Sequence, residues 1–161
     1  MFQFISIIII AALVGLDRVS KIVVVNNVKG EEPIKFLFGA FQLRYTENTG
    51  AAFSAFSDNT VVLAFFTVLV IFLCLFMLLT RKVKSKFASA CLILIISGGI
   101  GNAIDRIAEG YVVDFIEPLF MNFAVFNVAD IFITVGAFML IGYEIYELIK
   151  EKKEIKAKEN D

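Results

Sequence analysis

The chain has 161 residues, of which 59% are hydrophobic and 19% charged, with a formal net charge of −1. Whole helix-length windows contain no charge, which excludes a single soluble domain, because only lipid can surround such windows. The absence of histidine excludes Ser-His and Cys-His catalysis and removes the commonest zinc ligand, so any hydrolysis must rely on carboxylates. Cys74 and Cys91 lie in apolar runs and fit packing roles better than a disulfide or metal site. The net charge gives no reason to expect a nucleic-acid partner.

Four apolar runs reach the roughly twenty residues that a helix needs to cross a bilayer. No basic residue precedes the first and further runs follow it, so we interpret it as a retained span and not a cleaved signal sequence. The second holds no charge, the third ends at Asp105 and Arg106, and Asp130 interrupts the fourth near its start. The spans cover residues 2–25, 60–79, 87–106 and 125–149. We predict an all-α integral membrane protein of one domain, residues 1–161, with four transmembrane helices.

The connections on one side of these spans, residues 26–58 and 107–124, contain short β-type runs. Residues 36–45 combine aromatic and aliphatic side chains with partial alternation, and residues 111–116 form a second run before Pro118. We expect these runs to form a small extracytoplasmic β-sheet on the membrane surface.

Basic residues gather in the connection 81–86 and in the tail 150–161, which is predicted to be a frayed helix. The positive-inside rule places both segments, and therefore both termini, in the cytoplasm. The outer ends of spans one, three and four then carry Asp17, Lys21, Asp105, Arg106 and Asp130. Because each intramembrane charge is costly in lipid, their collection at one level predicts a shared polar site near the outer leaflet.

Asp114 and Asp130 are the candidate carboxylates for chemistry. Asp114 follows a β-type Val-Val pair and Asp130 opens the fourth span, so the segment between them allows the two to meet. Taken alone, Asp114 fits an ordinary loop carboxylate and Asp130 fits a helix cap. Asp130 lies within an apolar run, however, where a carboxylate without a partner is costly, and this favours a functional role.

The third span ends in a group of small residues followed by polar ones. Ser97 and Gly101 favour the close approach of another helix. Asn102, Asp105 and Arg106 follow and have two interpretations, as parts of a polar site or as anchors that extend to the headgroups.

Two smaller patterns precede the second span. Asp17 and Lys21 are four residues apart, so they share a helix face and fit a structural ion pair. Asn48 and Gly50 indicate a turn, in which the amide suits either the turn backbone or a ligand.

Together, five motifs resemble those of the lipoprotein signal peptidase family, which is also called signal peptidase II or prolipoprotein signal peptidase. They are Asp17-x-x-Ser20-Lys21, Asn48-x-Gly50-Ala51-Ala52-Phe53, Gly101-Asn102-x-x-Asp105-Arg106, Val112-Val113-Asp114-Phe115 and Phe126-Asn127-x-Ala129-Asp130. The resemblance extends from the first span to the fourth, and no motif position departs from it.

The resemblance implies an aspartic endopeptidase of the bacterial cytoplasmic membrane that cleaves prolipoproteins before a diacylglyceryl-modified cysteine, with Asp114 and Asp130 as the catalytic pair. It implies contacts with membrane lipids, inhibition by globomycin-type cyclic peptides, and no metal or organic cofactor. It assigns substrate binding to Asn48, Asn102, Arg106 and Asn127, and structural support to Asp17, Lys21, Gly50 and Asp105. A lipidated cysteine holds its peptide bond near the outer interface, at the depth of the predicted polar site.

Three other functions fit part of the pattern. A proton or ion translocator also needs intramembrane charges, but residues 61–79 and 131–143 offer almost no polar groups at mid-depth. A noncatalytic scaffold would use the outer charges as anchors and leaves Asp130 without an explanation. An intramembrane peptidase of the Gly-x-Gly-Asp type requires an aspartate where this chain has Asn102.

Overall fold

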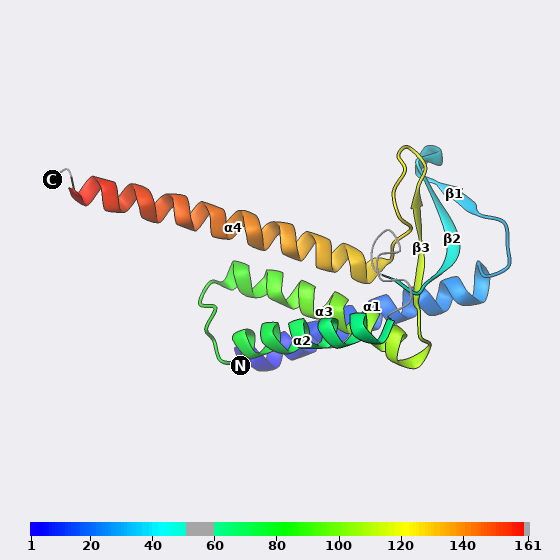
Figure 1. The fold of residues 1–161 in the computed structure, drawn as a ribbon, viewed down its shortest axis with the longest axis horizontal. Coiled ribbons are helices and arrows are strands. Elements are labelled where there is room, and N and C mark those ends of the chain that lie inside the picture. The colour runs from blue at the N-terminus through cyan, green and yellow to red at the C-terminus, as the bar shows by residue number, and fades with distance from the viewer. Residues whose placement is uncertain (51–59, 160–161) are drawn as a thin grey trace.

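The computed structural model describes residues 1–50 and 60–159. In chain order the elements are α1 (Phe2–Asn27), β1 (Ile34–Phe36), the short 3₁₀ helix η1 (Leu37–Gly39), β2 (Phe41–Asn48), α2 (Thr60–Leu79), α3 (Lys86–Ala108), β3 (Val112–Pro118) and α4 (Val128–Glu159). Helix α3 packs against each of the other three, and the strands stand across one end of the bundle (Figure 1). Four helices with a small sheet confirm the predicted fold class.

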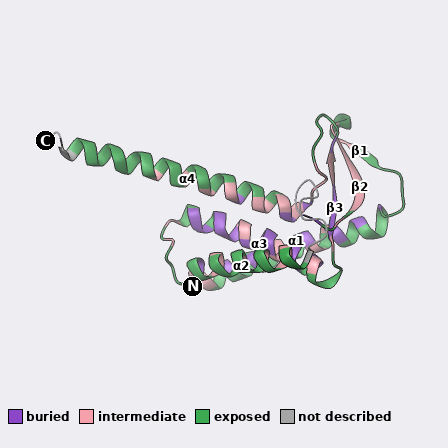
Figure 2. Ribbon diagram, viewed as in Figure 1, coloured by how far each residue is buried: buried purple, intermediate pink, exposed green. Residues whose placement is uncertain are grey.

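The helices have the length and surface of membrane spans. Among the described residues, Val61–Leu79, Lys86–Ala108 and Val128–Ala157 are long and apolar enough to cross a membrane. Helix α1 has 26 residues, which correspond to about 39 Å, more than the ~30 Å of a hydrocarbon core. Exposed apolar side chains cover α2 and much of α4, whereas buried residues concentrate on α3 (Figure 2). An exterior this apolar requires lipid around it.

The three strands join the two outer segments into one antiparallel sheet with the order β1-β2-β3. Strand β2 pairs with β3 from Phe41 opposite Pro118 to Asn48 opposite Val112. The predicted small sheet is therefore present. Its β3 strand continues to Pro118, two residues beyond the predicted run. This register places the end of β2 next to Asp114, which pairs with Thr46.

Small residues on α3 allow the close helix packing that the sequence predicts. A Cβ on Gly98 would lie 2.3 Å from the carbonyl oxygen of Ala129 in α4. One on Gly101 would lie 2.5 Å from Oδ2 of Asp17 in α1. Glycine at these positions therefore lets α3 approach α1 and the start of α4 at the same level.

Several helix ends differ from the predicted spans. Helix α4 begins at Val128 instead of residue 125, because Phe126 forms a bridge with Ile116 of the sheet. It continues as a helix to Glu159, so the described part of the tail is an extension of α4, as the prediction of a helical tail requires. Helices α1 and α3 each continue two residues past the predicted ends. The motif residues 51–53, with the rest of the outer segment to residue 58, lie outside the described residues.

Candidate active site

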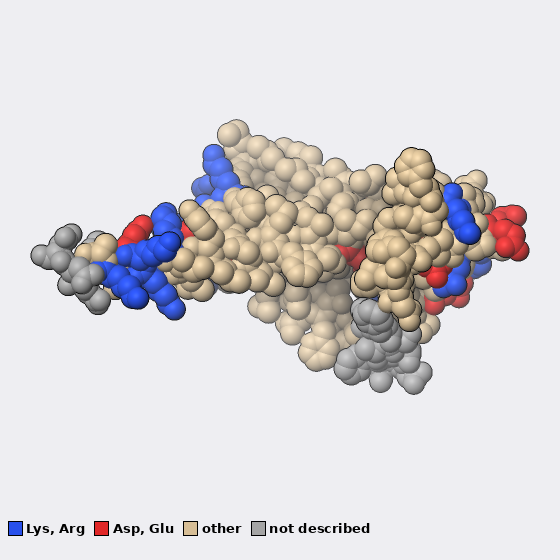
Figure 3. Space-filling model, turned by 90° about the horizontal axis from the view of Figure 1, so that it is seen from above, with Lys and Arg blue, Asp and Glu red and all other residues tan. Residues whose placement is uncertain are grey.

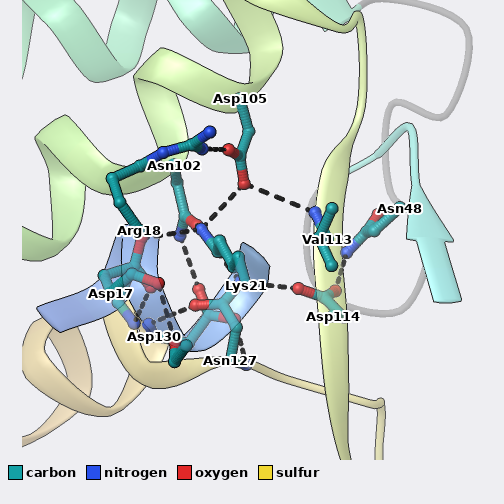
Figure 4. A network of polar contacts seen from close by, with 12 residues as sticks. Asp17, Arg18, Lys21, Asn48, Asn102, Asp105, Val113, Asp114, Asn127 and Asp130 are labelled. Atoms are coloured by element: carbon teal, nitrogen blue, oxygen red, sulfur yellow. Dashed lines mark hydrogen bonds and ion pairs between the residues drawn. The ribbon is translucent and has the colours of Figure 1, made fainter. Parts of the chain in front are cut away.

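Buried charges from α1 and α3 form an ion-pair cluster at the end of the bundle that carries the sheet (Figure 4). The Nζ of Lys21, a residue only 2% exposed, lies 2.9 Å from Oδ2 of Asp17 and 2.8 Å from Oδ2 of Asp105. Arg18 pairs with the other oxygen of Asp105. The predicted ion pair between Asp17 and Lys21 is present, and it belongs to a larger cluster.

This cluster also binds backbone groups of the neighbouring elements. Oδ1 of Asp17 accepts a hydrogen bond from the N–H of Ala129 in the first turn of α4, at 3.0 Å. Oδ2 of Asp105 accepts one from the N–H of Val113 in β3, at 3.4 Å. Asp105 is therefore buried among partners, which contradicts the alternative that it is an interfacial anchor. The cluster holds α1, α3, β3 and the start of α4 together.

Asp130 lies in the first turn of α4, where it and Asn127 cap the helix reciprocally. Oδ1 of Asn127 accepts a hydrogen bond from the N–H of Asp130 at 3.0 Å, and Oδ2 of Asp130 accepts one from the N–H of Asn127 at 3.1 Å. The remaining oxygen of Asp130 accepts from Nδ2 of Asn102 at 2.7 Å. Asp130 is thus part of a helix cap, and it also has a partner outside its own helix.

Two asparagines connect this carboxylate to Asp114 on the sheet (Figure 4). Nδ2 of Asn127 donates to Oδ1 of Asp114 at 2.6 Å and to Oδ1 of Asn102 at 3.1 Å. The same oxygen of Asn102 accepts from Nζ of Lys21 at 3.0 Å. Asn127 therefore contacts both aspartates, and the structure brings together the two carboxylates that the sequence separates by an outer segment.

Asn48 and Arg106 complete the polar surface beside Asp114. Nδ2 of Asn48 donates to Oδ2 of Asp114 at 2.8 Å, while its Oδ1 accepts from the N–H of Gly50 at 2.9 Å. The interpretation of Asn48 as a turn residue is thus correct, and its amide also contacts the carboxylate of Asp114. A contact between Asn48 and a ligand stays a prediction. Nη2 of Arg106 donates to the carbonyl of Gly50 at 3.0 Å. Its buried Nε has no hydrogen-bond partner among the described residues.

A cavity of about 390 Å³ opens beside the two aspartates. Its polar wall consists of Asn48, Asn102, Arg106, Asp114 and Asp130. Its apolar wall combines residues 123–126 with Ile131, Ile133 and Val135 of α4. Asp105 is absent from the lining among the described residues. A cavity with one polar and one apolar wall suits a ligand that has both a peptide-like and a hydrocarbon part.

Asp114 has the environment of an acid–base group. The side chain is 2% exposed. Its pKa is raised to about 6, first because burial disfavours the carboxylate and then because Asp130 adds a second negative charge, while donors from Asn48 and Asn127 oppose the shift. Two carboxylates this close share a proton more readily than both ionise, and such a pair can supply an acid and a base. Among the described residues, no group of three or more potential ligands is placed to hold a metal ion.

Two features of the site were not predicted from the sequence. Arg18 contacts Asp105, and its only signal was an intramembrane charge next to Asp17. Residues 123–126 were assigned to the outer segment and the start of a span, whereas they form a wall of the cavity. The apolar character of this wall matched that of the adjacent span, so composition alone did not separate the two.

Comparisons with known proteins connect this site to a family. The family model of signal peptidase II matches residues 9–146. The chain belongs to the signal peptidase II family. Among its relatives, the lipoprotein signal peptidase of Streptococcus thermophilus is 48% identical over 132 residues, which cover 82% of this chain and 86% of the relative. That of Streptococcus pyogenes serotype M2 is 43% identical over 129 residues, covering 80% and 85%.

Solved structures agree with this assignment. One bacterial membrane enzyme, solved by the in meso method, superimposes with a TM-score of 0.84 at 25% identity and covers 92% of both chains. A second superimposes with a TM-score of 0.78 at 26% identity, covering 88% of this chain and 92% of the other. The resemblance inferred from the five motifs is confirmed. As a member of the signal peptidase II family with spanning helices, the chain is an integral membrane peptidase.

Proposed function

We propose that the chain is an aspartic endopeptidase in which Asp114 and Asp130 are the catalytic pair. The observation that carries this proposal is the bridge through Asn127, whose side-chain amide donates to Asp114 and whose backbone N–H donates to Asp130. Both carboxylates also line one cavity. Hydrogen-bond donors that approach from the protein side orient the carboxylates and leave the cavity side for water and a peptide bond.

In the proposed resting enzyme the two aspartates share one proton, and we assign the proton to Asp114 and the negative charge to Asp130. Asp130 lies at the positive end of the α4 dipole and accepts a backbone N–H and an amide N–H, all of which favour a carboxylate. Asp114 accepts hydrogen bonds from the side-chain amides of Asn48 and Asn127, and its pKa is raised to about 6, mainly by burial.

Hydrolysis then follows an acid–base sequence. Asp130 takes a proton from water as the water oxygen attacks the scissile carbonyl carbon, and Asp114 donates its proton to the carbonyl oxygen. When the tetrahedral intermediate collapses, Asp130 gives its proton to the leaving nitrogen and Asp114 recovers one from a hydroxyl of the intermediate. Both aspartates return to their starting state. Donors for substrate carbonyls come from the Nε of Arg106, which has no hydrogen-bond partner within residues 1–50 and 60–159, and from the amides of Asn48 and Asn102.

The proposed substrate is a bacterial prolipoprotein, cleaved before a cysteine that carries a diacylglyceryl group. Relatives are named lipoprotein signal peptidases, and the cavity has an apolar wall beside its polar one. The polar wall suits the peptide and the apolar wall suits the acyl chains. Globomycin-type cyclic peptides are proposed inhibitors, because a peptide with a hydrocarbon chain presents the same two surfaces.

The active site faces the outside of the cytoplasmic membrane, with both termini in the cytoplasm. In support, basic side chains gather at the end of the molecule opposite the sheet (Figure 3), where the positive-inside rule places the cytoplasm. A membrane-impermeant thiol reagent added outside intact cells should label Glu32→Cys and spare Lys84→Cys. The reverse pattern would contradict this orientation.

The decisive experiment is cleavage of a diacylglyceryl-modified prolipoprotein by purified protein in detergent. Asp114→Asn and Asp130→Asn should each lower kcat by about 10²- to 10⁴-fold without loss of fold, because an amide cannot exchange the required proton. Glu109→Gln, at an exposed carboxylate past the end of α3, is the matched control and should retain full activity. Full activity in either aspartate variant would refute the catalytic pair. Equal cleavage of an unlipidated precursor would refute the role of the lipid.

A further inference from the structure

One end of the sheet carries a group of exposed apolar side chains that the peptidase chemistry does not use. It consists of Leu37, Phe38, Leu119, Phe120 and Met121, each of them exposed, and is called the apolar tip below. The two segments that supply it, residues 36–41 and 118–126, contain no charged residue. Lys35, Arg44 and Glu117 carry charge elsewhere on the sheet. The tip is therefore a charge-free part of a sheet that carries charged side chains elsewhere.

The fold builds the tip from parts of the chain that are far apart in sequence. Phe41 pairs with Pro118 where β2 meets β3, and the N–H of Leu119 donates to the carbonyl of Ala40 at 2.8 Å. The ring of Phe120 packs edge-on against that of Phe41, with centroids 5.5 Å apart. These contacts hold the two charge-free segments side by side.

The backbone at the tip adopts an unfavourable conformation that keeps apolar side chains exposed. Leu37 and Phe38 have φ of 46° and 55°, in the left-handed region that is unfavourable for a non-glycine residue. Phe38 is fully exposed, so burial of its ring within the chain does not offset this cost. A partner outside the chain is needed to bury these side chains.

The position of the tip identifies that partner. The sheet crosses the end of the bundle, and the tip projects past α4 over the space beside the helices (Figure 1). Seen from this side, uncharged atoms make up most of the surface of the helices and of the near part of the sheet, with a small acidic patch where the two meet, while most charged side chains of the sheet lie on the side away from the helices (Figure 3). The apolar tip thus lies at the end of the bundle whose helices present apolar side chains to lipid.

We propose that the apolar tip inserts into the outer leaflet of the bilayer, at the boundary between headgroups and acyl chains. Aromatic and aliphatic side chains next to a charged surface are the composition that partitions to this depth. The insertion concerns the chain's contact with lipid and does not depend on the proposed catalytic pair. Residues 123–126 continue from the tip into the cavity wall. Insertion of the tip therefore holds these residues at the membrane surface and keeps the mouth of the cavity at the depth of the lipid.

The test uses the absence of tryptophan from the chain, because a single introduced tryptophan then reports its own surroundings. Phe38→Trp and Phe120→Trp are compared with Glu32→Trp, at an exposed position in the connection before β1. Each full-length protein is reconstituted into phosphatidylcholine vesicles with or without lipids brominated in the upper acyl chain. Since tryptophan itself favours the interface, the Glu32→Trp control carries the same bias.

Brominated lipid should lower the fluorescence of both tip variants by about twofold or more and leave Glu32→Trp nearly unchanged. Acrylamide in the water should quench the tryptophan of Glu32→Trp more strongly than that of either tip variant. Phe38 is fully exposed, so its variant tests the tip even if Phe120→Trp disturbs the contact with Phe41. Equal acrylamide quenching of the tip and control variants, with no effect of brominated lipid at Phe38→Trp, would overturn the proposal. That outcome would leave the catalytic proposal intact.

Discussion

Nζ of Lys21 donates a hydrogen bond to Oδ1 of Asn102 across 3.0 Å, between α1 and α3. An ammonium group has donors only, so this contact determines which end of the Asn102 amide faces α1. Nδ2 of Asn102 is then directed at Asp130, 2.7 Å away. A residue outside the cavity thereby determines which hydrogen bonds Asp130 receives.

Asn102→Asp tests the orientation of this amide. The variant keeps an oxygen for Lys21 and places a second oxygen against Asp130, which repels the catalytic carboxylate. We expect kcat to fall by about 100-fold with a smaller change in KM, measured with a lipidated precursor. Asn27→Asp makes the same change at an exposed position of α1 and should be neutral. A wild-type kcat for Asn102→Asp would show that the donor to Asp130 is dispensable.

Lys21→Met should destabilise the protein, because it leaves Asp17 buried without its cation and Asp105 with only the partly exposed Arg18. Breaking a buried ion pair costs on the order of 3–5 kcal/mol. The midpoint of thermal unfolding, followed by reaction of a fluorogenic dye with the buried thiol of Cys91, should fall by several degrees. Lys29→Met removes an exposed pair with Glu47, and it should shift the midpoint little. Similar shifts in both variants would contradict the importance of the buried cluster.

Asp114 makes stability depend on pH in a direction that its pKa determines. The folded-state pKa of about 6 exceeds the ordinary value of 3.8, so between these values the folded protein binds the proton more tightly than the unfolded chain. Stability from this group is therefore present at low pH and declines as pH rises from about 4 to 6, by up to about 3 kcal/mol. The amide of Asp114→Asn cannot ionise. As pH rises over this range, the unfolding midpoint of the wild type should therefore fall relative to that of the variant. A constant difference would refute the raised pKa.

Gly101→Ala should weaken the contact between α1 and α3. The added Cβ would lie 2.5 Å from Oδ2 of Asp17, so the buried ion pair with Lys21 must shift. We expect a loss of about 1–3 kcal/mol, seen as a lower unfolding midpoint. At Gly142 a Cβ meets nothing within 4 Å, and Gly142→Ala should be neutral or slightly stabilising. Equal behaviour of the two variants would indicate that α1 adjusts without cost.

Much of the fold and the location of the site were determined by the sequence itself. Charge-free windows of about twenty residues have one stable state in a bilayer, so the helices and the composition of their surfaces follow from hydropathy. The cost of charge in lipid likewise explains why the polar residues share one level. These constraints act on each segment separately, so local sequence patterns are enough to predict their effects.

Only the tertiary structure decided which polar groups meet. The N–H of Ala129 reaches Asp17 across 112 positions of the chain, and Asn48 reaches Asp114 across 66. Such contacts depend on how closely helices pack and on strand register, which no local period specifies. The structure thereby placed Asp105 in the ion-pair cluster with Arg18, and it turned residues 123–126 from an assumed span start into a wall of the cavity. The depth of a polar residue in the membrane follows from its own segment, whereas its hydrogen-bond partners follow from how all the segments pack together.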